Sequence, residues 1–314
     1  MGTRRCMVGF SLLATLLVSS GCSGPATTEV APPPTPAGDG ALSVYVVDYP
    51  LDYFAKRIGG DRVAVSFPAP ADEDPAFWSP DAETVLAYQG ADLILLNGAG
   101  YAKWVEVATL PKSRLVDTSA AFGDRLIRVD STLTHSHGPE GEHSHGETAF
   151  TVWLDLGLAV EQARAIKEVL AAARPEHAAD FEDGFSSLER DLLAVDTELA
   201  GLAAEGRARP VLGSHPVYQY LARRYELDLA SVHFEPDEFP DEAAWSGLEA
   251  LLNEHPAAWM LWEGEPLAET ASRLRDAGVE SVVFDPCGNR PPEGDFLTVM
   301  RANVDNLRPV LTGE

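Results

Sequence analysis

The sequence predicts an α/β protein with two lobes, each a parallel β-sheet flanked by helices, joined by one long rigid connecting helix. Short apolar, β-branched runs alternate with helix-period segments in two separate sets along the 314 residues. These runs lack the polar alternation of a half-exposed strand, which indicates parallel strands covered on both faces. A long segment of helical periodicity lies between the two sets and separates the lobes.

The first forty residues have the pattern of a secretion signal followed by a tether. Two arginines precede an apolar run over residues 7–18, which is too short to span a bilayer. Small residues then precede Cys22, as in a bacterial lipobox, although Ser19 stands where Leu is usual. We expect a signal peptide over residues 1–21, a lipid anchor on Cys22 and a flexible Pro- and Gly-rich tether over residues 22–41.

The N-terminal lobe is expected over residues 42–174. Its helices are predicted over residues 51–60 and 81–90, because each amphipathic run ends on glycine. Its strands are predicted over residues 42–50, 62–67, 91–100 and 114–117.

The connecting helix is expected over residues 175–205. Apolar positions repeat at helical spacing over residues 157–206, with one interruption at Arg174-Pro175. One helix therefore ends near residue 173 and a second runs from Pro175 to about residue 204. A coiled coil is the alternative, but the heptads do not persist.

The C-terminal lobe is expected over residues 206–314. Its helices are predicted over residues 216–226, 241–254 and 265–278. Its strands are predicted over residues 209–215, 229–236, 257–264 and 281–286.

Charge and cysteine usage limit the classes of function. The chain has 23 basic and 49 acidic residues, a formal charge of −26, which excludes nucleic acid and anionic membrane surfaces as electrostatic partners and suits cations. Once the signal is removed and Cys22 is lipidated, only Cys287 remains, so no internal disulfide is expected. We expect Cys287 to be a buried, inert thiol.

Potential metal ligands stand at the ends of the predicted strands, where open parallel sheets bind their ligands. Imidazoles and carboxylates that converge there suit a divalent ion, although a single acid at a strand end is often a helix N-cap. In the second lobe these residues are His215, His233, Glu235, Glu263 and Asp285, and Asp48 and Asn97 hold similar positions in the first lobe.

A histidine-rich segment, THSHGPEGEHSHGETAF, occupies residues 134–150 and contains two His-x-His pairs. In an extended chain residues i and i+2 face the same way, so each pair is able to hold one ion. Composition alone leaves a metal site, a metal collector and a solvated loop open. The four histidines are His135, His137, His143 and His145.

The order of several segments resembles the metal-binding (zinc or manganese) substrate-binding lipoproteins of ABC transporters. The segments are DYFAKRIGGDRVAV, ADLILLNGAG, VWLD, GSH followed by YLARRYEL, and FDP, spread over residues 42–309. The resemblance implies a metal cleft between the lobes. It also implies a non-enzymatic, monomeric lipoprotein of the periplasm or cell surface, which captures Zn²⁺ (alternatively Mn²⁺) and delivers it to an ABC permease.

This sequence departs from the family pattern at two ligand positions. Ala76 stands where relatives carry a His after Asp-Pro, and Thr151 stands where a His precedes VWLD by one residue. His215 and Asp285 match the family's second-lobe ligands, so we expect the site to centre on them, with Glu263 and His233 as further candidates.

The histidine-rich loop, residues 134–148, is expected to supply the missing first-lobe ligands. Thr151 lies six positions after His145, and an extended chain spans roughly 20 Å over that length. Ordering eleven residues would cost roughly 11–22 kcal/mol, against the about 10–16 kcal/mol that a good structural zinc site releases. We therefore favour His143 and His145, near the anchored end, over His135 and His137, which would be auxiliary.

Other residues and functions are weaker candidates. Glu73 and Asp74 are more typical of a solvated turn than of oxygen ligands to a metal. His177 and His255 are expected on the surface. A metal buffer without a permease, and a relative that has lost tight metal binding and takes another ligand, remain open. A hydrolase is disfavoured because neither G-x-S-x-G nor H-E-x-x-H is present, and an adhesin role has no signal in the sequence.

Overall fold

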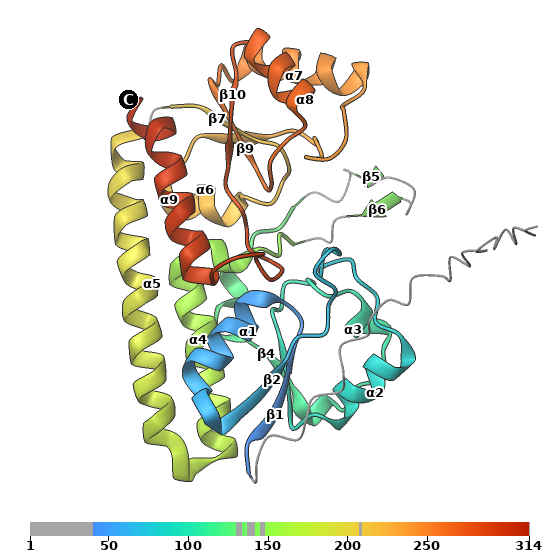
Figure 1. The fold of residues 1–314 in the computed structure, drawn as a ribbon, viewed down its shortest axis with the longest axis vertical. Helices are drawn as coiled ribbons and strands as arrows, with labels where there is room; N and C mark the ends of the chain where they lie inside the picture. The colour runs from blue at the N-terminus through green and yellow to red at the C-terminus, as the bar shows by residue number, and fades with distance from the viewer. Residues whose placement is uncertain (1–39, 130–133, 137–141, 145–147, 207–208, 314) are drawn as a thin grey trace, which may run out of the picture. The chain divides into compact units, whose positions relative to one another are not determined.

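The structure is a computed structural model that describes residues 40–129, 134–136, 142–144, 148–206 and 209–313 (Figure 1). The expected signal peptide, the Cys22 anchor and most of the tether lie outside these ranges. Within them, no helix is both long enough and apolar enough to cross a membrane.

The first sheet contains the four strands predicted for the N-terminal lobe, all parallel and in the order β2-β1-β3-β4. The helices α1 and α2 begin after aspartates that cap them: Asp48 accepts from the N–H of Leu51, and Asp81 accepts from that of Thr84. The elements are β1 (Leu42–Val46), α1 (Tyr49–Gly59), β2 (Val63–Ser66), α2 (Ala82–Gly90), β3 (Leu93–Leu96), α3 (Trp104–Val107) and β4 (Leu115–Asp117). The one-turn α3 was not predicted.

Two long helices follow the first sheet. They are α4 (Leu156–Ala173) and α5 (Ala178–Gly206), separated by the interruption expected at Arg174-Pro175. A short 3-10 turn over Pro175–His177 precedes α5 because the proline ring cannot continue α4. The helix α5 contacts α1, α4, α6 (Gln219–Tyr225) and α9 (Phe296–Thr312), and therefore touches helices of both lobes.

The second sheet repeats the strand order of the first. Its four parallel strands lie in the order β10-β9-β7-β8, so in each sheet the first strand of the set lies between the second and the third. The remaining elements are β7 (Val211–Gly213), β8 (Leu229–Ser231), α7 (Glu242–Glu254), β9 (Trp259–Trp262), α8 (Ala268–Asp276) and β10 (Glu280–Val283).

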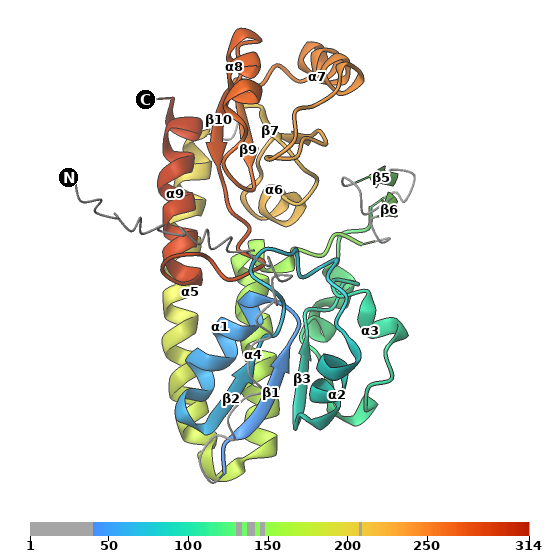
Figure 2. The same ribbon diagram turned by 45° about the vertical axis from the view of Figure 1, so that its right-hand side comes forward.

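The C-terminal helix α9 was not predicted, although its sequence carries a signal. Asp295 caps it, and apolar side chains recur at helical spacing along one buried face. The helix follows the last strand of the second sheet, yet Phe296 packs against Tyr53 and Phe54 of α1. In Figures 1 and 2, α9 runs beside α5, so two helices connect the lobes.

The apolar core reflects these connections. The larger cluster of buried side chains includes residues of both lobes, among them Val44, Phe54, Tyr220 and Phe284. A smaller cluster around Trp245 and Trp262 fills the space beneath α7 and α8. The lobes therefore share a continuous core along the α4–α5–α9 side.

The histidine-rich segment is described only in part. Residues Thr134–Ser136 (β5) and Glu142–Ser144 (β6) pair as antiparallel strands, with His135 opposite His143, and Arg128 pairs with Thr148 at the base. The sequence suggested a loop, and the described residues form a short hairpin instead. His137 and His145 lie outside the described residues.

Candidate metal centre

A pocket of about 740 Å³ lies where the carboxyl ends of the two sheets meet. Its lining comes from segments far apart in the sequence, and it combines carboxylates, one imidazole and aromatic rings. The polar residues that line it are Asp72, Glu73, Asp74, Tyr101, Thr151, His215, Glu235, Glu263, Asp285 and Asn289.

The strand order explains why these residues converge. Ligands of open α/β sheets bind at the point where the strand order reverses, which in the second sheet lies between β7 and β9. His215 follows β7 and Glu263 follows β9, while Glu235 and Asp285 follow the two outer strands. The prediction from strand ends placed these residues together, and all four line one pocket.

His215 is the buried nitrogen donor of the pocket, with 4% of its surface exposed. Its Nε2 lies 3.5 Å from Oε1 of Glu235, and its Nδ1 lies 4.0 Å from Oε1 of Glu263. The ring of His233 stands perpendicular to that of His215, with centroids 5.4 Å apart. His233, a candidate ligand from the sequence, does not line the pocket and packs against the ring of His215.

The carboxylates repel one another. Burial raises the pKa of Glu263 to about 8, and the charges of Asp74, Glu235 and Asp285 add to this shift. Burial also raises the pKa of Asp285, against a hydrogen bond from the N–H of Cys287 to its Oδ1. A divalent cation would relieve this repulsion by replacing protons with a shared positive charge.

The main chain around Asp285 is fixed on both sides. The Asp285 N–H donates to Oδ1 of Asn303, and Nδ2 of Asn303 donates back to the Asp285 carbonyl oxygen. Cys287 takes a left-handed conformation with φ of 58°, which turns the chain after Asp285. Its side chain is buried, as expected, and burial raises the pKa of its thiol.

The first-lobe edge of the pocket carries carboxylates in place of a histidine. Ala76 is buried and does not line the pocket, whereas Glu73 and Asp74 line it and stay exposed. Asp74 holds a turn, because its Oδ1 accepts from the N–H of Ala76 and its carbonyl oxygen accepts from those of Phe77 and Trp78. The sequence favoured a solvated turn for this segment, with an oxygen-ligand role as the alternative, and the residues form an exposed turn that also lines the pocket.

Several hydrogen bonds cross from one lobe to the other around the pocket. Nδ2 of Asn289 donates to the carbonyl oxygens of Pro70 (2.6 Å) and Glu73 (2.8 Å). Nε1 of Trp153 donates to the carbonyl oxygen of Pro286 over 2.7 Å. No local sequence pattern indicated these contacts, since each joins residues more than 130 positions apart.

The described residues bring together only part of the expected ligand set. Among them, no group of three or more His, Cys, Asp or Glu side chains is arranged to hold a metal ion. His215, Glu263 and Asp285 line one pocket, whereas His177 and His255 lie outside it, next to Asp180 and the Val211 carbonyl oxygen. The part played by His143 and His145 stays a prediction.

Comparison with known proteins identifies a matching family. The protein-family model ZnuA, described as "Zinc-uptake complex component A periplasmic", matches residues 44–310. The zinc-binding lipoprotein AdcA of Streptococcus pneumoniae serotype 4 is 27% identical over 284 residues, which cover 86% of this chain and 56% of AdcA. The chain therefore spans little more than half the length of that relative.

Two further proteins show the same likeness. The iron ABC transporter substrate-binding lipoprotein MtsA of Streptococcus pyogenes serotype M1 is 22% identical over 325 aligned residues, 98% of each chain. The crystal structure of the metal-dependent lipoprotein YcdH of Bacillus subtilis superposes with a TM-score of 0.74 at 21% identity, covering 86% of this chain and 99% of that one. This similarity confirms the predicted two-lobed α/β fold.

Proposed function

The chain belongs to the ZnuA family of periplasmic zinc-uptake components, and from this premise we propose that it captures a divalent metal ion, zinc first of all, and delivers it to an ABC permease. Members of this family bind solutes for transport and are not enzymes. The observation that supports the proposal most directly is the pocket between the two sheets, where His215 faces Glu235 and Glu263.

The proposed site is centred on His215 and Asp285. Glu263 is a third ligand, while His233 supports the ring of His215. Zinc rarely binds tightly with fewer than three protein ligands. If all the ligands came from one lobe, metal binding would not change the position of the other lobe. We therefore assign the first-lobe ligands to His143 and His145, with His135 and His137 as an auxiliary pair.

The donor set is compatible with zinc and with manganese. Imidazole suits zinc, and carboxylate oxygens suit the harder manganese ion. The named relatives also differ in their metal, since AdcA is a zinc-binding lipoprotein and MtsA is an iron ABC transporter lipoprotein. Zinc is the first choice because the matching family is one of zinc uptake.

Location follows from the same proposal. Relatives of this chain are named lipoproteins of ABC transporters, and we propose that Cys22 carries the lipid that holds the monomeric protein outside the cytoplasmic membrane.

The test is metal analysis of the purified full chain, followed by zinc titration in competition with a chelator. We expect one tight site, and His215→Ala should weaken it at least tenfold. His177→Ala is the matched control, because His177 pairs with Asp180 at the start of α5, outside the pocket. Equal affinity in the His215→Ala protein and the unaltered protein would overturn the ligand assignment.

A second candidate function rests on Ala76 and Thr151, which leave the first lobe without the two histidines that the resemblance implies. A chain that has lost tight metal binding would bind zinc no better than its His215→Ala variant, and it would carry no metal after purification.

A further inference from the structure

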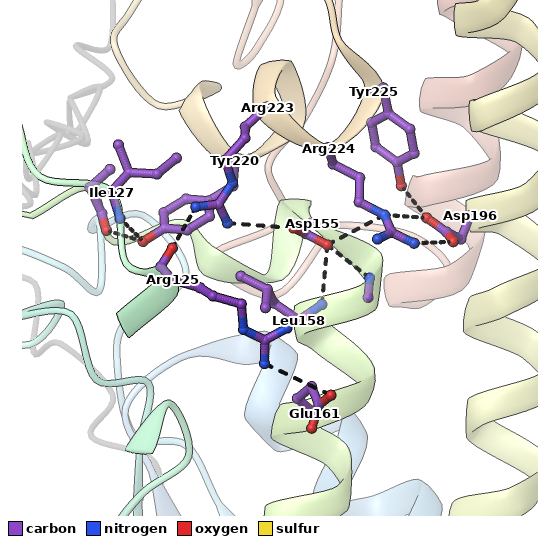
Figure 3. Close-up of polar contacts among 12 residues, drawn as sticks. Arg125, Ile127, Asp155, Leu158, Glu161, Asp196, Tyr220, Arg223, Arg224 and Tyr225 are labelled. Atoms are coloured by element: carbon purple, nitrogen blue, oxygen red, sulfur yellow. Dashed lines mark hydrogen bonds and ion pairs between the residues drawn. The ribbon is translucent and has the colours of Figure 1, made fainter. Parts of the chain in front are cut away.

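The helix α6 begins four residues after His215, and its side chains contact the first lobe and the connecting helix (Figure 3). Its contacts form a network of two arginines, two tyrosines and two aspartates that lies outside the lining of the pocket. The network comprises Asp155, Asp196, Tyr220, Arg223, Arg224 and Tyr225.

Arg224 is held by two carboxylates from different helices. Its Nη2 and Nε donate to the two oxygens of Asp196 in α5, over 2.6 and 3.0 Å, and its Nε lies 3.5 Å from Oδ1 of Asp155. The hydroxyl of Tyr225 donates to the same Asp196 over 2.9 Å. Asp155 and Asp196 are both buried, and Asp196 raises the pKa of Arg224 further above its usual range. Such a forked, partly buried pair fixes geometry more firmly than a fully exposed ion pair does.

Asp155 has a second task at the start of α4. Its Oδ1 accepts from the N–H groups of Gly157 and Leu158, which caps the helix, while Oδ2 lies 3.6 Å from Nη2 of Arg223. Gly157 allows Arg224 to approach the first turn of α4 closely, because a Cβ at this position would lie 2.9 Å from Nη1 of Arg224. One carboxylate therefore ties the first turn of α4 to two arginines of α6.

Tyr220 and Arg223 bind the first lobe through its backbone. The Tyr220 hydroxyl accepts from the N–H of Ile127 and donates to the carbonyl oxygen of Ala149. Nη1 of Arg223 donates to the carbonyl oxygen of Arg125. These contacts hold α6 against two separate segments of the first lobe.

The same helix determines where the proposed ligands lie. Tyr218 immediately precedes α6, and its hydroxyl donates over 2.9 Å to the carbonyl oxygen of Phe284, the residue before Asp285. The N–H of Ala222 in α6 donates back to the Tyr218 carbonyl oxygen. A displacement of α6 would therefore move both His215 and the end of the strand that presents Asp285.

We propose that Arg224 is a positioning residue for the metal site: held between Asp155 and Asp196, it fixes α6, and through α6 the imidazole of His215, relative to the first lobe. It touches no metal and acts by pre-organisation, since a site whose ligands are already in place loses less ordering entropy when the ion binds. The inference rests on the proposed function, in which His215 is a metal ligand.

The test compares Arg224→Gln, Arg224→Lys and Asp155→Asn with a matched control. Arg273 forms a forked pair with Glu242 through Nη1 (2.9 Å) and Nη2 (3.2 Å), between α8 and α7 and outside the pocket lining, so Arg273→Gln is the control. Zinc affinity of the purified full chain is measured by chelator competition, and melting of the zinc-free protein is followed in parallel.

We expect Arg224→Gln to weaken zinc binding at least fivefold. Arg224→Lys, which keeps the charge but loses the fork, should give a smaller loss, and Arg273→Gln should stay within twofold of the unaltered protein. In a double-mutant cycle with Asp196→Asn, the two losses should not add, because both changes break one pair.

The possible results separate the positioning role from the proposed function. A folded Arg224→Gln protein that melts lower but binds zinc with unchanged affinity, while His215→Ala fails to bind, would overturn only the positioning role. Unchanged affinity in His215→Ala would overturn the ligand assignment. If Arg224→Gln does not fold, the zinc affinities and melting temperatures of Arg224→Lys and Asp155→Asn are compared in the same way. Asp155→Asn is suitable because Asn still caps α4 but carries no charge.

Discussion

The hydroxyl of Thr151 donates a short hydrogen bond to the carbonyl oxygen of Val217, two residues after His215. Thr151 is buried at the edge of the pocket, at the position where the family resemblance implies a histidine ligand. Its hydroxyl is thus used to join the lobes. This hydrogen bond joins the two lobes at one edge of the pocket.

Asn289 should control the opposite edge of the pocket. Its side chain holds residues 70–73 through two hydrogen bonds, and Asn289→Ala removes both. We expect zinc affinity to fall severalfold, because Asp74 and its neighbours lose their fixed position beside Glu263. Titration with a competing chelator measures this loss.

The control for Asn289 is Asn253→Ala. Asn253 donates one similar bond to the carbonyl oxygen of Glu249 within α7, outside the pocket lining, so its loss should leave zinc affinity unchanged. Equal effects of the two changes would show that the bonds of Asn289 act on stability alone.

The histidine-rich segment should be part of the tight site. Deleting residues 135–145 is expected to weaken that site tenfold or more, since it removes the proposed first-lobe ligands. Neutral imidazole is the binding form, so affinity should also fall steeply below about pH 6.5. Both effects are read from zinc titrations across pH.

Paired substitutions separate ligands from collectors. Changing His143 and His145 to Ala should reproduce most of the loss, while changing His135 and His137 should remove only weak additional sites. A tight site that keeps its affinity after the deletion would mean that the segment only collects metal.

Asp48 should make the stability of the protein depend on pH. Burial, with a smaller contribution from the charge of Asp52, raises its pKa to about 7, against the hydrogen bond from Leu51. Between about pH 4 and pH 7 the folded state keeps a proton that the unfolded state releases, so the free energy of unfolding falls as pH rises through this range. Asp48→Asn keeps the helix cap and removes this dependence.

Denaturant unfolding at pH 5 and pH 8 measures the effect of Asp48→Asn. At pH 8 the variant should be more stable by on the order of a few kcal/mol, because each pKa unit corresponds to about 1.4 kcal/mol. Asp81 caps α2 in the same way from an exposed position, and Asp81→Asn should not change the pH dependence in this range. Similar behaviour of the two variants would count against burial as the cause.

Cys22 should anchor the protein to the membrane. Changing Cys22 to Ser should move the protein from the membrane fraction to the soluble extracytoplasmic fraction, as followed by fractionation and blotting. Recovery of the unaltered protein in the cytoplasm would contradict the predicted signal.

The sequence by itself determined most of the regular elements, α3 and α9 excepted, and part of the candidate site. All eight strands of the two sheets were predicted, because a short apolar, β-branched run is a local feature that can be recognised in the sequence. His215, Glu263 and Asp285 were recognised because parallel strands place their carboxyl ends at one edge, so a local pattern was enough to predict their meeting.

Only the tertiary structure decided the roles of Asp74, Asn289 and Arg224. Asp74 looked like a surface turn in the sequence, and it lines the pocket because Asn289, more than 200 positions later, holds the same segment. Arg224 lies in the YLARRYEL segment that carries the family resemblance, but its partners are distant in sequence: Asp155 caps α4 and Asp196 lies in α5. Hydrophobic periodicity shows which face of an element is buried but not which distant polar group that element meets, because such pairs depend on how the elements pack.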